Sequence, residues 1–548
     1  MVSFVTQTEL HTMKRIMLAW AILACGHSFS FAADPIKPAL EIRIQSISKF
    51  TDYAGFVGDM VGQQDQFEQY ANVVKAFAGK KGIEGFDIKR PIGLYGELTK
   101  DIHDSPVVLL IPIADEAAAR NSLKAYAQLN LKPIGNGIDE TELPNVPMPV
   151  LIRFADGYLQ ATLGNRANFD RAIAPKYFFG DNPPALADVK LHVERIPAET
   201  RRVLLGQIEF QLQREKDQLK ENERSASKRA ISGYILDGAA AMLKTVMDDT
   251  KTISLALTAK PDQELVAVDF KLIPIPGRPL ADMIESAAKK PSSTIGRAAA
   301  DNPMFRAYLN VALTEGQRKK LEPVIDDCLN EAEVGVDAFV AELFKKFLAS
   351  IEPTLKSGDL DFSAVLDGPG SNNKHRLNLM LKMKKGLDLV DTLVEATRII
   401  PAAMIEPKFD LEKIDGQKVH TFTIHEKPGK LEELFGGTAI WAGTSNDLLS
   451  LGFEADGKLL KSALAAKSTK GPIAEIDLAM GRLSVLLADD DKKTAMKKAV
   501  KEIAIQDSQA DRIRLTVDGG SELSVSLTAK SKALKVFIAM DKVSKSGN

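Results

Sequence analysis

The sequence contains very little cysteine. Only Cys25 and Cys328 occur among its 548 residues, and Cys25 lies in an N-terminal segment that we expect to be removed. The remaining chain then has no pair of thiols for an internal disulfide, but at this length its apolar core suffices for folding, even in an oxidising compartment. We expect Cys328 to be a buried structural thiol, because Val324, Ile325 and Leu329 accompany it at helical spacing; a reactive thiol is the alternative.

An excess of charge of one sign is also missing. Lysine and arginine together number 71, against 73 for aspartate and glutamate, so the formal net charge is −2. This balance supplies no global electrostatic field that would attract DNA, RNA or an anionic membrane. We therefore expect no nucleic-acid partner.

Linear signatures of catalysis are absent as well. The chain has no Gly-x-Ser-x-Gly elbow, no Walker-type phosphate loop and no Gly-x-Gly-x-x-Gly turn. Gly436 and Gly437 precede a strand-like run, which is the wrong order for a phosphate-binding turn. We predict no catalytic residues, no cofactor-binding residues and no cofactor. A hydrolase without a linear motif is the enzymatic alternative.

Residue types that bind metals occur without convincing spacing. His420 and His425 belong to one strand-like run, and their odd separation places them on opposite faces of a strand. Residues 101–104 combine two aspartates and a histidine, which we interpret as a solvated turn because no fourth ligand is near. Residues 489–491 are three aspartates without the spacing of a calcium loop, and helix capping accounts for them. We predict no metal site.

The N-terminus carries the pattern of an export signal. Residues 13–15 form a basic start, residues 16–25 form a short apolar run, and Ser30 and Ala32 are the small residues before a cleavage site. We predict a signal peptide over residues 1–32, of which residues 1–12 precede a better start, and a periplasmic or extracellular mature protein. Lipid anchoring at Cys25, within a sequence resembling a lipoprotein box, is the alternative. No later apolar run reaches transmembrane length, so we expect no membrane span in the mature chain.

The clearest strand pattern lies at residues 253–272. Apolar residues alternate with polar or small ones on both sides of a Lys-Pro-Asp-Gln-Glu turn, which predicts an antiparallel hairpin with one buried face. Related patterns at residues 360–383 and 523–540 predict two more hairpins. Several residues of the first pattern return in the last at a constant offset of 270, which indicates internal duplication.

We therefore predict an α+β protein made of duplicated modules, in which antiparallel sheet is covered on one face by helices. Residues 40–185 form an α/β module, and residues 401–470 repeat it in shortened form. A second module type, made of a strand, a long helical segment and a hairpin, is expected at residues 186–290, 291–400 and 471–548.

Two of the expected helical segments differ in what they expose. Residues 336–351 carry a broad apolar stripe, which we expect to pack against a sheet; a lipid or partner face is the alternative. Residues 213–229 are nearly free of apolar residues, which predicts a solvated helical arm, with a docking role as the alternative.

The segments GFDIKRPIGLYG (residues 85–96) and VVLLIPIAD (residues 107–115), together with the export signal and the strand–helix–hairpin pattern, resemble large exported proteins of planctomycete-type bacteria, a group without an assigned function. The resemblance implies an extracytoplasmic location and carries over no catalytic residues.

Our first functional hypothesis is a non-enzymatic envelope protein that binds or scaffolds another envelope component. The second is a periplasmic carrier of a lipid or other amphiphile in a cavity between sheet and helices. The partner is accordingly an envelope protein or an amphiphilic ligand. An open apolar cavity favours the carrier, and exposed apolar patches on a filled core favour the scaffold.

Overall fold

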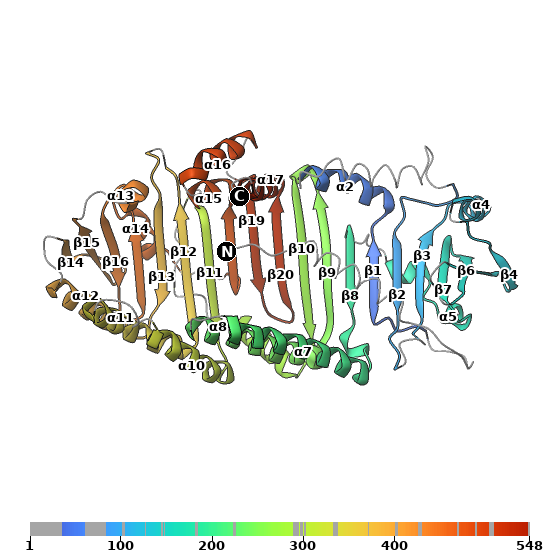
Figure 1. Ribbon diagram of the computed structural model, residues 1–548, viewed down its shortest axis with the longest axis horizontal. Helices are drawn as coiled ribbons and strands as arrows, with labels where there is room; N and C mark the ends of the chain where they lie inside the picture. The colour runs from blue at the N-terminus through green and yellow to red at the C-terminus, as the bar shows by residue number, and fades with distance from the viewer. Residues whose placement is uncertain are drawn as a thin grey trace. The chain divides into compact units, whose positions relative to one another are not determined.

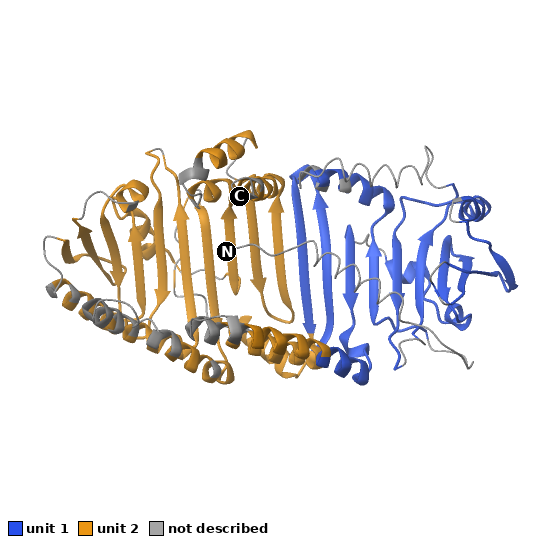
Figure 2. Cartoon of the chain, viewed as in Figure 1, with its two compact units in different colours: residues 1–206, 250–273 blue, residues 207–249, 274–548 orange. Residues whose placement is uncertain are grey.

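The computed structural model describes residues 35–60, 84–100, 105–126, 128–143, 146, 148–180, 185–222, 226–288, 295, 300, 303–331, 338–370, 372–399, 404–425, 430–467, 471–487, 490–503 and 509–545. They form helices and antiparallel strands, which confirms the predicted α+β class (Figure 1). The chain divides into two compact units (Figure 2). Unit 1 comprises residues 1–206 and 250–273, and unit 2 comprises residues 207–249 and 274–548.

Unit 1 is organised around an antiparallel sheet. Its strands lie in the order β4-β5-β6-β7-β3-β2-β1-β8-β9-β10. The strands are β1 (Leu40–Ile44), β2 (Ile92–Gly96), β3 (Val107–Pro112), β4 (Lys132–Gly135), β5 (Ile138–Thr141), β6 (Val150–Ala155), β7 (Tyr158–Leu163), β8 (Ala187–Leu191), β9 (Thr250–Lys260) and β10 (Leu265–Pro274). The helices are α2 (Ile47–Met60), α4 (Glu116–Tyr126), α5 (Ala167–Asp170), α6 (Pro175–Phe179) and the start of α7 (Ala198–Asn222), with the 3-10 turns η2 (Val193–Arg195) and η3 (Pro261–Gln263).

Unit 2 is also organised around an antiparallel sheet, in the order β14-β15-β16-β17-β13-β12-β11-β18-β19-β20. The strands are β11 (Pro303–Ala312), β12 (Asp359–Asp367), β13 (Arg376–Lys382), β14 (Ile405–Ile414), β15 (Gln417–Ile424), β16 (Ala439–Thr444), β17 (Leu448–Phe453), β18 (Ala474–Ala479), β19 (Arg512–Asp518) and β20 (Leu523–Lys530). The helices are the rest of α7, α8 (Ala226–Asp249), α9 (Pro279–Ala288), α10 (Glu315–Glu331), α11 (Ala338–Ser357), α12 (Gly386–Ile399), α13 (Lys430–Phe435), α14 (Lys458–Ala465), α15 (Met480–Leu487), α16 (Asp490–Glu502) and α17 (Ser531–Lys545).

The two sheets order their strands in the same way. Adding ten to each strand number of unit 1 reproduces the strand order of unit 2. Equivalent tight turns accompany this order, because Asn136 and Gly137 join β4 to β5 while Asp415 and Gly416 join β14 to β15. All four residues have positive φ, between 46° and 83°. Two consecutive residues of positive φ give the hairpin turn whose twist matches antiparallel strands.

In unit 1, the part of the sheet around β3 and β7 is packed on both faces. On one face, Tyr95 and Val108 lie in a core with Phe178 of α6, whose ring centroid is 4.9 Å from that of Tyr95. On the other face, Ile152 packs with Leu123 of α4. The alternation of side chains along each strand places apolar residues on both faces here.

Unit 2 is also packed on both faces, around β13 and β17. Met380 packs with Leu460 of α14 on one face, whereas Leu449 packs with Leu389 of α12 on the other. The expectation that helices cover only one face of the sheet is therefore wrong in this region. Neighbouring residues such as Leu448 and Leu449 are both apolar, so the strand supplies a core on each side.

The hairpin predicted at residues 523–540 is wrong. Residues 523–530 form β20, but the next segment is α17, and the true hairpin pairs β19 with β20. Ala533, Val536 and Met540 share one core cluster, and their spacing is that of a helix face. The few alternating residues after β20 that resembled a second strand therefore belong to a helix, whose apolar residues recur every three to four positions. The hairpins at residues 253–272 and 360–383 are confirmed as β9–β10 and β12–β13.

Several predicted helices are present. α7 and α8 contain the described parts of residues 213–229, and most described side chains in this stretch are exposed, as expected for a solvated arm. α11 contains most of residues 336–351, although most side chains of residues 336–351 lie outside the described residues. Its described Ile351 packs with the core of α12 and β17.

Candidate ligand-binding faces of the sheets

One face of the unit 1 sheet is a continuous aliphatic surface, which we call floor 1. Residues that oppose each other on neighbouring strands extend this surface across the sheet. Leu255 of β9 opposes Val189 of β8, and Val189 opposes Ile42 of β1. Ile42 in turn opposes Leu94 of β2. Floor 1 consists of Leu40, Ile42, Ile44, Ile92, Leu94, Val107, Leu109, Ile111, Ala187, Val189, Leu191, Ile253, Leu255 and Leu257.

None of the floor 1 side chains is buried. All are half-buried except Leu255, which is 46% exposed although it lies in the middle of β9. The prediction that the hairpin at residues 253–272 has a buried apolar face is therefore wrong for this strand. Its alternation is correct, but the described residues leave Leu255 partly uncovered.

Unit 2 presents an equivalent surface, which we call floor 2. Ile476 of β18 opposes Ala307 on one side and Leu515 on the other, and Leu515 opposes Leu527 of β20. Ile476 is 41% exposed and Leu527 is 42% exposed. Floor 2 consists of Phe305, Ala307, Leu309, Ala474, Ile476, Leu478, Ile513, Leu515, Val517, Val525 and Leu527.

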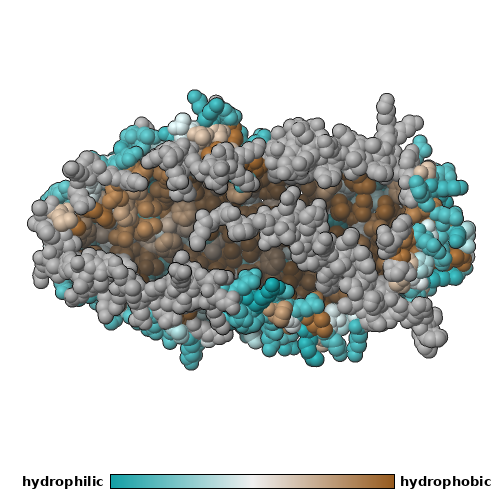
Figure 3. Space-filling view, in the orientation of Figure 1, coloured by the Kyte–Doolittle hydropathy of each residue, from teal (hydrophilic) through white to brown (hydrophobic). Residues whose placement is uncertain are grey.

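Hydrophobic residues are exposed on the face of each unit that Figure 3 shows. In unit 2, α15 and α17 contact the strands beside one margin of the floor, where Leu478 and Ile513 join the core of Met480, Ala533 and Val536 (Figure 1). The floors contain no charged residue, no tyrosine and no tryptophan.

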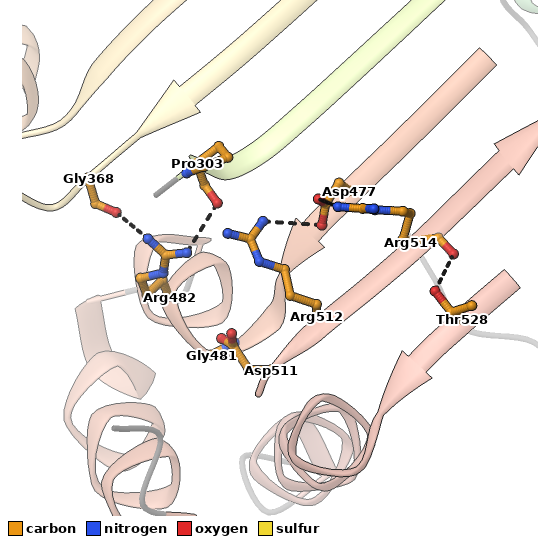
Figure 4. Close-up of polar contacts among 9 residues, drawn as sticks. All are labelled: Pro303, Gly368, Asp477, Gly481, Arg482, Asp511, Arg512, Arg514 and Thr528. Carbon is orange, nitrogen blue, oxygen red and sulfur yellow. Dashed lines mark hydrogen bonds and ion pairs between the residues drawn. The ribbon is translucent and has the colours of Figure 1, made fainter. Parts of the chain in front are cut away.

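Around β18 and β19, the opposite face of the unit 2 sheet carries paired charged residues. Asp477, which neighbours Ile476 on β18, is buried and accepts hydrogen bonds from Arg512 at 3.1 Å and from Arg514 at 2.9 Å (Figure 4). In unit 1, Arg43 of β1 donates to Asp188 of β8 at 2.9 Å. At these strands, each sheet pairs charged side chains on one face and leaves aliphatic side chains half-exposed on the other.

The polar cluster of Figure 4 also fixes the ends of strands. Arg482 of α15 donates to the backbone oxygens of Gly368 and Pro303, both at 3.1 Å, and burial lowers its pKa (Figure 4). Asp511 accepts from the backbone N–H of Gly481 at 2.8 Å, and burial raises its pKa. These contacts tie α15 to β11, β12 and β19. The role of this cluster is therefore structural, because it holds α15 against the sheet.

One arrangement in unit 1 comes closest to a hydrolytic triad. His192 Nε2 lies 2.7 Å from Glu41 Oε1, and His192 Nδ1 lies 3.5 Å from Thr252 Oγ1. Burial acts to raise the pKa of Glu41, but the hydrogen bond with His192 and nearby cations lower it overall. The candidate nucleophile, Thr252, is buried. A substrate carbonyl has no access to its hydroxyl, so the arrangement does not support hydrolysis.

The residues singled out from the sequence are not brought together. His420 is buried, its Nδ1 accepts from the backbone N–H of Asp410 at 3.1 Å, and its Nε2 lies 2.9 Å from Thr444 Oγ1. His425 is exposed, with Glu406 at 3.4 Å. Residues 1–32 and 101–104 lie outside the described residues, as do the side chains of Cys328 and of residues 489–491.

Within the described part of the chain, no group of three or more His, Cys, Asp or Glu side chains is placed to hold a metal ion. Among the described helices, none has the length and apolarity needed to cross a membrane. Sequence reasoning missed the two floors as sites. The available signal was the alternation of aliphatic residues on β8, β9, β18 and β19, but alternation alone does not tell which apolar faces are covered.

Comparison with known proteins identifies no relative. No protein-family model matches the chain, and searches of curated proteins and of solved structures find no significant match either.

Proposed function

We propose that this protein is a carrier that holds the apolar chains of a lipid or similar amphiphile against floor 1 and floor 2. The observation that supports this function is the exposure of Leu255, Ile476 and Leu527 in the middle of strands whose neighbours on the same face are also aliphatic. A face of this kind is normally covered by another layer of the same protein.

The energetic argument follows from the exposed area. Complete burial of a leucine or isoleucine side chain contributes roughly 1.5–3 kcal/mol. A residue that is nearly half exposed therefore leaves about 1 kcal/mol to be gained when an apolar ligand covers it. An acyl chain lying across several strands would cover several such residues at once.

The composition of the floors favours an acyl chain over a protein. The centres of protein–protein interfaces are enriched in tyrosine, tryptophan and arginine, which supply most of the binding energy. The floors contain none of these residue types. The scaffold hypothesis, which the sequence placed first, therefore has less support than the carrier. The buried Thr252 leaves the hydrolase with the least support.

Two further proposals complete this function. We propose that the protein is exported, on the strength of the signal pattern in residues 1–32, and works where amphiphiles are present outside the cytoplasm. We also propose that units 1 and 2 are copies of one duplicated ancestral unit. The shared strand order and the equivalent turns at Asn136-Gly137 and Asp415-Gly416 support this relation.

The carrier proposal is tested by native mass spectrometry of the protein purified from its own envelope, beside titration with a fluorescent fatty acid. Leu255→Lys and Leu527→Lys place an ammonium group on each floor. We expect each to weaken fatty-acid binding to its floor at least tenfold, because a loss of about 1.4 kcal/mol already corresponds to a factor of ten. Leu387→Lys is the matched control, since Leu387 is 45% exposed on α12 and belongs to neither floor.

An additional mass in the lipid range, lost on harsher activation and reduced in the floor variants but not in Leu387→Lys, would support the carrier. Protein that carries no small molecule and binds fatty acid no better than these variants would refute it. Copurification with a stoichiometric polypeptide under those conditions would favour the scaffold.

A further inference from the structure

Helix α16 in unit 2 has one packed face and one basic face. Met496 is buried, and Val500 and Ile503 pack against the core formed by Met480, Ala533 and Val536. Met496, Val500 and Ile503 are spaced four and three residues apart, so they form one stripe along the helix. The helix is thus held against α15 and α17 by this stripe.

Three lysines lie on the side of α16 that faces away from this stripe, beside the exposed Glu502. Lys497, Lys498 and Lys501 are exposed, and their positions on a helix of 3.6 residues per turn place them together, away from the packed stripe. Among the described residues, no carboxylate forms an ion pair with any of the three. Many other lysines of the chain are paired, such as Lys356 with Asp326 at 2.8 Å. The near-neutral charge of the whole chain conceals this local excess.

An exposed apolar residue lies on the helix that packs beside α16. Phe537 of α17 is 51% exposed, whereas Val536 and Ala533 are fully buried. The same helix contacts β19 and β20, the strands that carry part of floor 2. A basic surface, an exposed aromatic ring and an aliphatic floor therefore occur within one group of packed elements.

We propose that the basic face of α16 docks on the anionic surface of a lipid bilayer and brings floor 2 to the membrane. Lysines beside an anionic surface are attracted by its negative potential, and an aromatic side chain such as Phe537 inserts into the interface. This inference rests on the proposed carrier function, because docking at this position gives an amphiphile a short path between bilayer and floor. It names the partner surface, which the carrier function leaves open.

The test is cosedimentation of the full chain with vesicles of phosphatidylcholine alone and of phosphatidylcholine mixed with phosphatidylglycerol. The variant K497Q/K498Q/K501Q removes the basic face. The matched control K124Q/K132Q/K176Q removes three exposed lysines of unit 1 for which no ion pair occurs among the described residues. Its net charge equals that of the first variant.

We expect the wild type and the control to bind the anionic vesicles and to lose binding as salt is added. The α16 variant should bind them about 100-fold more weakly, since each lysine near such a surface contributes roughly fivefold. Equal binding by both variants, or equal binding of the wild type to both kinds of vesicle, would overturn the proposal. Capture of an acidic protein in place of anionic vesicles would also overturn it.

The two proposals fail separately. The α16 variant should retain its amphiphile in native mass spectrometry, because its substitutions leave the floors intact. If an amphiphile is bound on the floors but vesicle binding does not depend on the lysines, the docking inference is refuted and the carrier function is not. If vesicle binding depends on the lysines but the protein carries no amphiphile, the carrier function is refuted and membrane docking is not.

Discussion

Glu454 ties the N-terminus of α14 to the sheet of unit 2, and its removal should destabilise this unit strongly. Its carboxylate is buried and accepts two backbone hydrogen bonds, from Leu459 and from Leu460, each at 2.8 Å. Both leucines are themselves buried in the core of unit 2. The side chain therefore positions a helix whose residues fill that core.

The magnitude follows from these two contacts. Hydrogen bonds to a charged acceptor contribute roughly 1.5–3 kcal/mol each, and alanine would leave two buried N–H groups without a partner. Burial raises the pKa of Glu454 despite the two backbone donors, so the cost of burying the charge offsets part of this gain. We expect Glu454→Ala to lower the free energy of unfolding by about 2–4 kcal/mol. Glu454→Gln should cost less, because its amide keeps one acceptor oxygen.

Urea unfolding followed by tryptophan fluorescence measures this loss. Trp441 packs against the same core and donates to the backbone oxygen of Glu454 at 3.1 Å. Trp20 is the only other tryptophan, so a chain that begins after residue 32 reports on unit 2 alone. Glu433→Ala removes an exposed glutamate from α13 and should change stability by less than about 0.5 kcal/mol. If Glu454→Ala were no more destabilising than this control, the capping argument would be wrong.

Two further predictions concern the same unit. Burial lowers the pKa of His420 below its ordinary value, so its stabilising contribution is complete above about pH 6.5 and is lost as the pH falls through the folded-state pKa. Urea midpoints at about pH 7.5 and about pH 5.5 should therefore fall more for the wild type than for His420→Gln; parallel changes would contradict the neutral, buried assignment. Gly457 has a φ of +68°, and a Cβ there would lie 2.8 Å from the ring of Trp441, so Gly457→Ala should cost at least about 1 kcal/mol and shift the fluorescence of Trp441. Gly238→Ala, in an open position of α8, should instead stabilise by about 0.5–1 kcal/mol, and a similar loss in both variants would show that local strain at Gly457 is not the cause.

Much of the secondary structure could be predicted because its signals are local. The strands β6 and β7 are short, largely apolar runs on either side of a turn, and Asp156 and Gly157 between them adopt the positive φ values of 54° and 71° that a tight hairpin requires. The segment after β20 was mispredicted because a few alternating residues fit both a strand and a helix. Only the packing of Ala533 and Val536 against Met480 decides between them.

The polar anchors could not be predicted. Glu454 and Asp511 are ordinary acids in the sequence, and nothing near them in the chain indicates that they are buried beneath helix N-termini. The same limit applies to the pairing of Asp477 with Arg512, which are far apart in the sequence. Contacts of this kind depend on which strands become neighbours.

The sequence by itself determined the α+β class, the confirmed hairpins and helices, and the alternation that gives each floor strand an aliphatic side. These follow from residue spacing and turn chemistry, which act over a few residues. Only the tertiary structure decided the strand order of the two sheets, the burial of Glu454 and Asp477, and the exposure of Leu255 and Leu527. The physical reason is that exposure depends on what packs above a side chain, and here helices cover parts of each sheet and leave the aliphatic floors half-exposed.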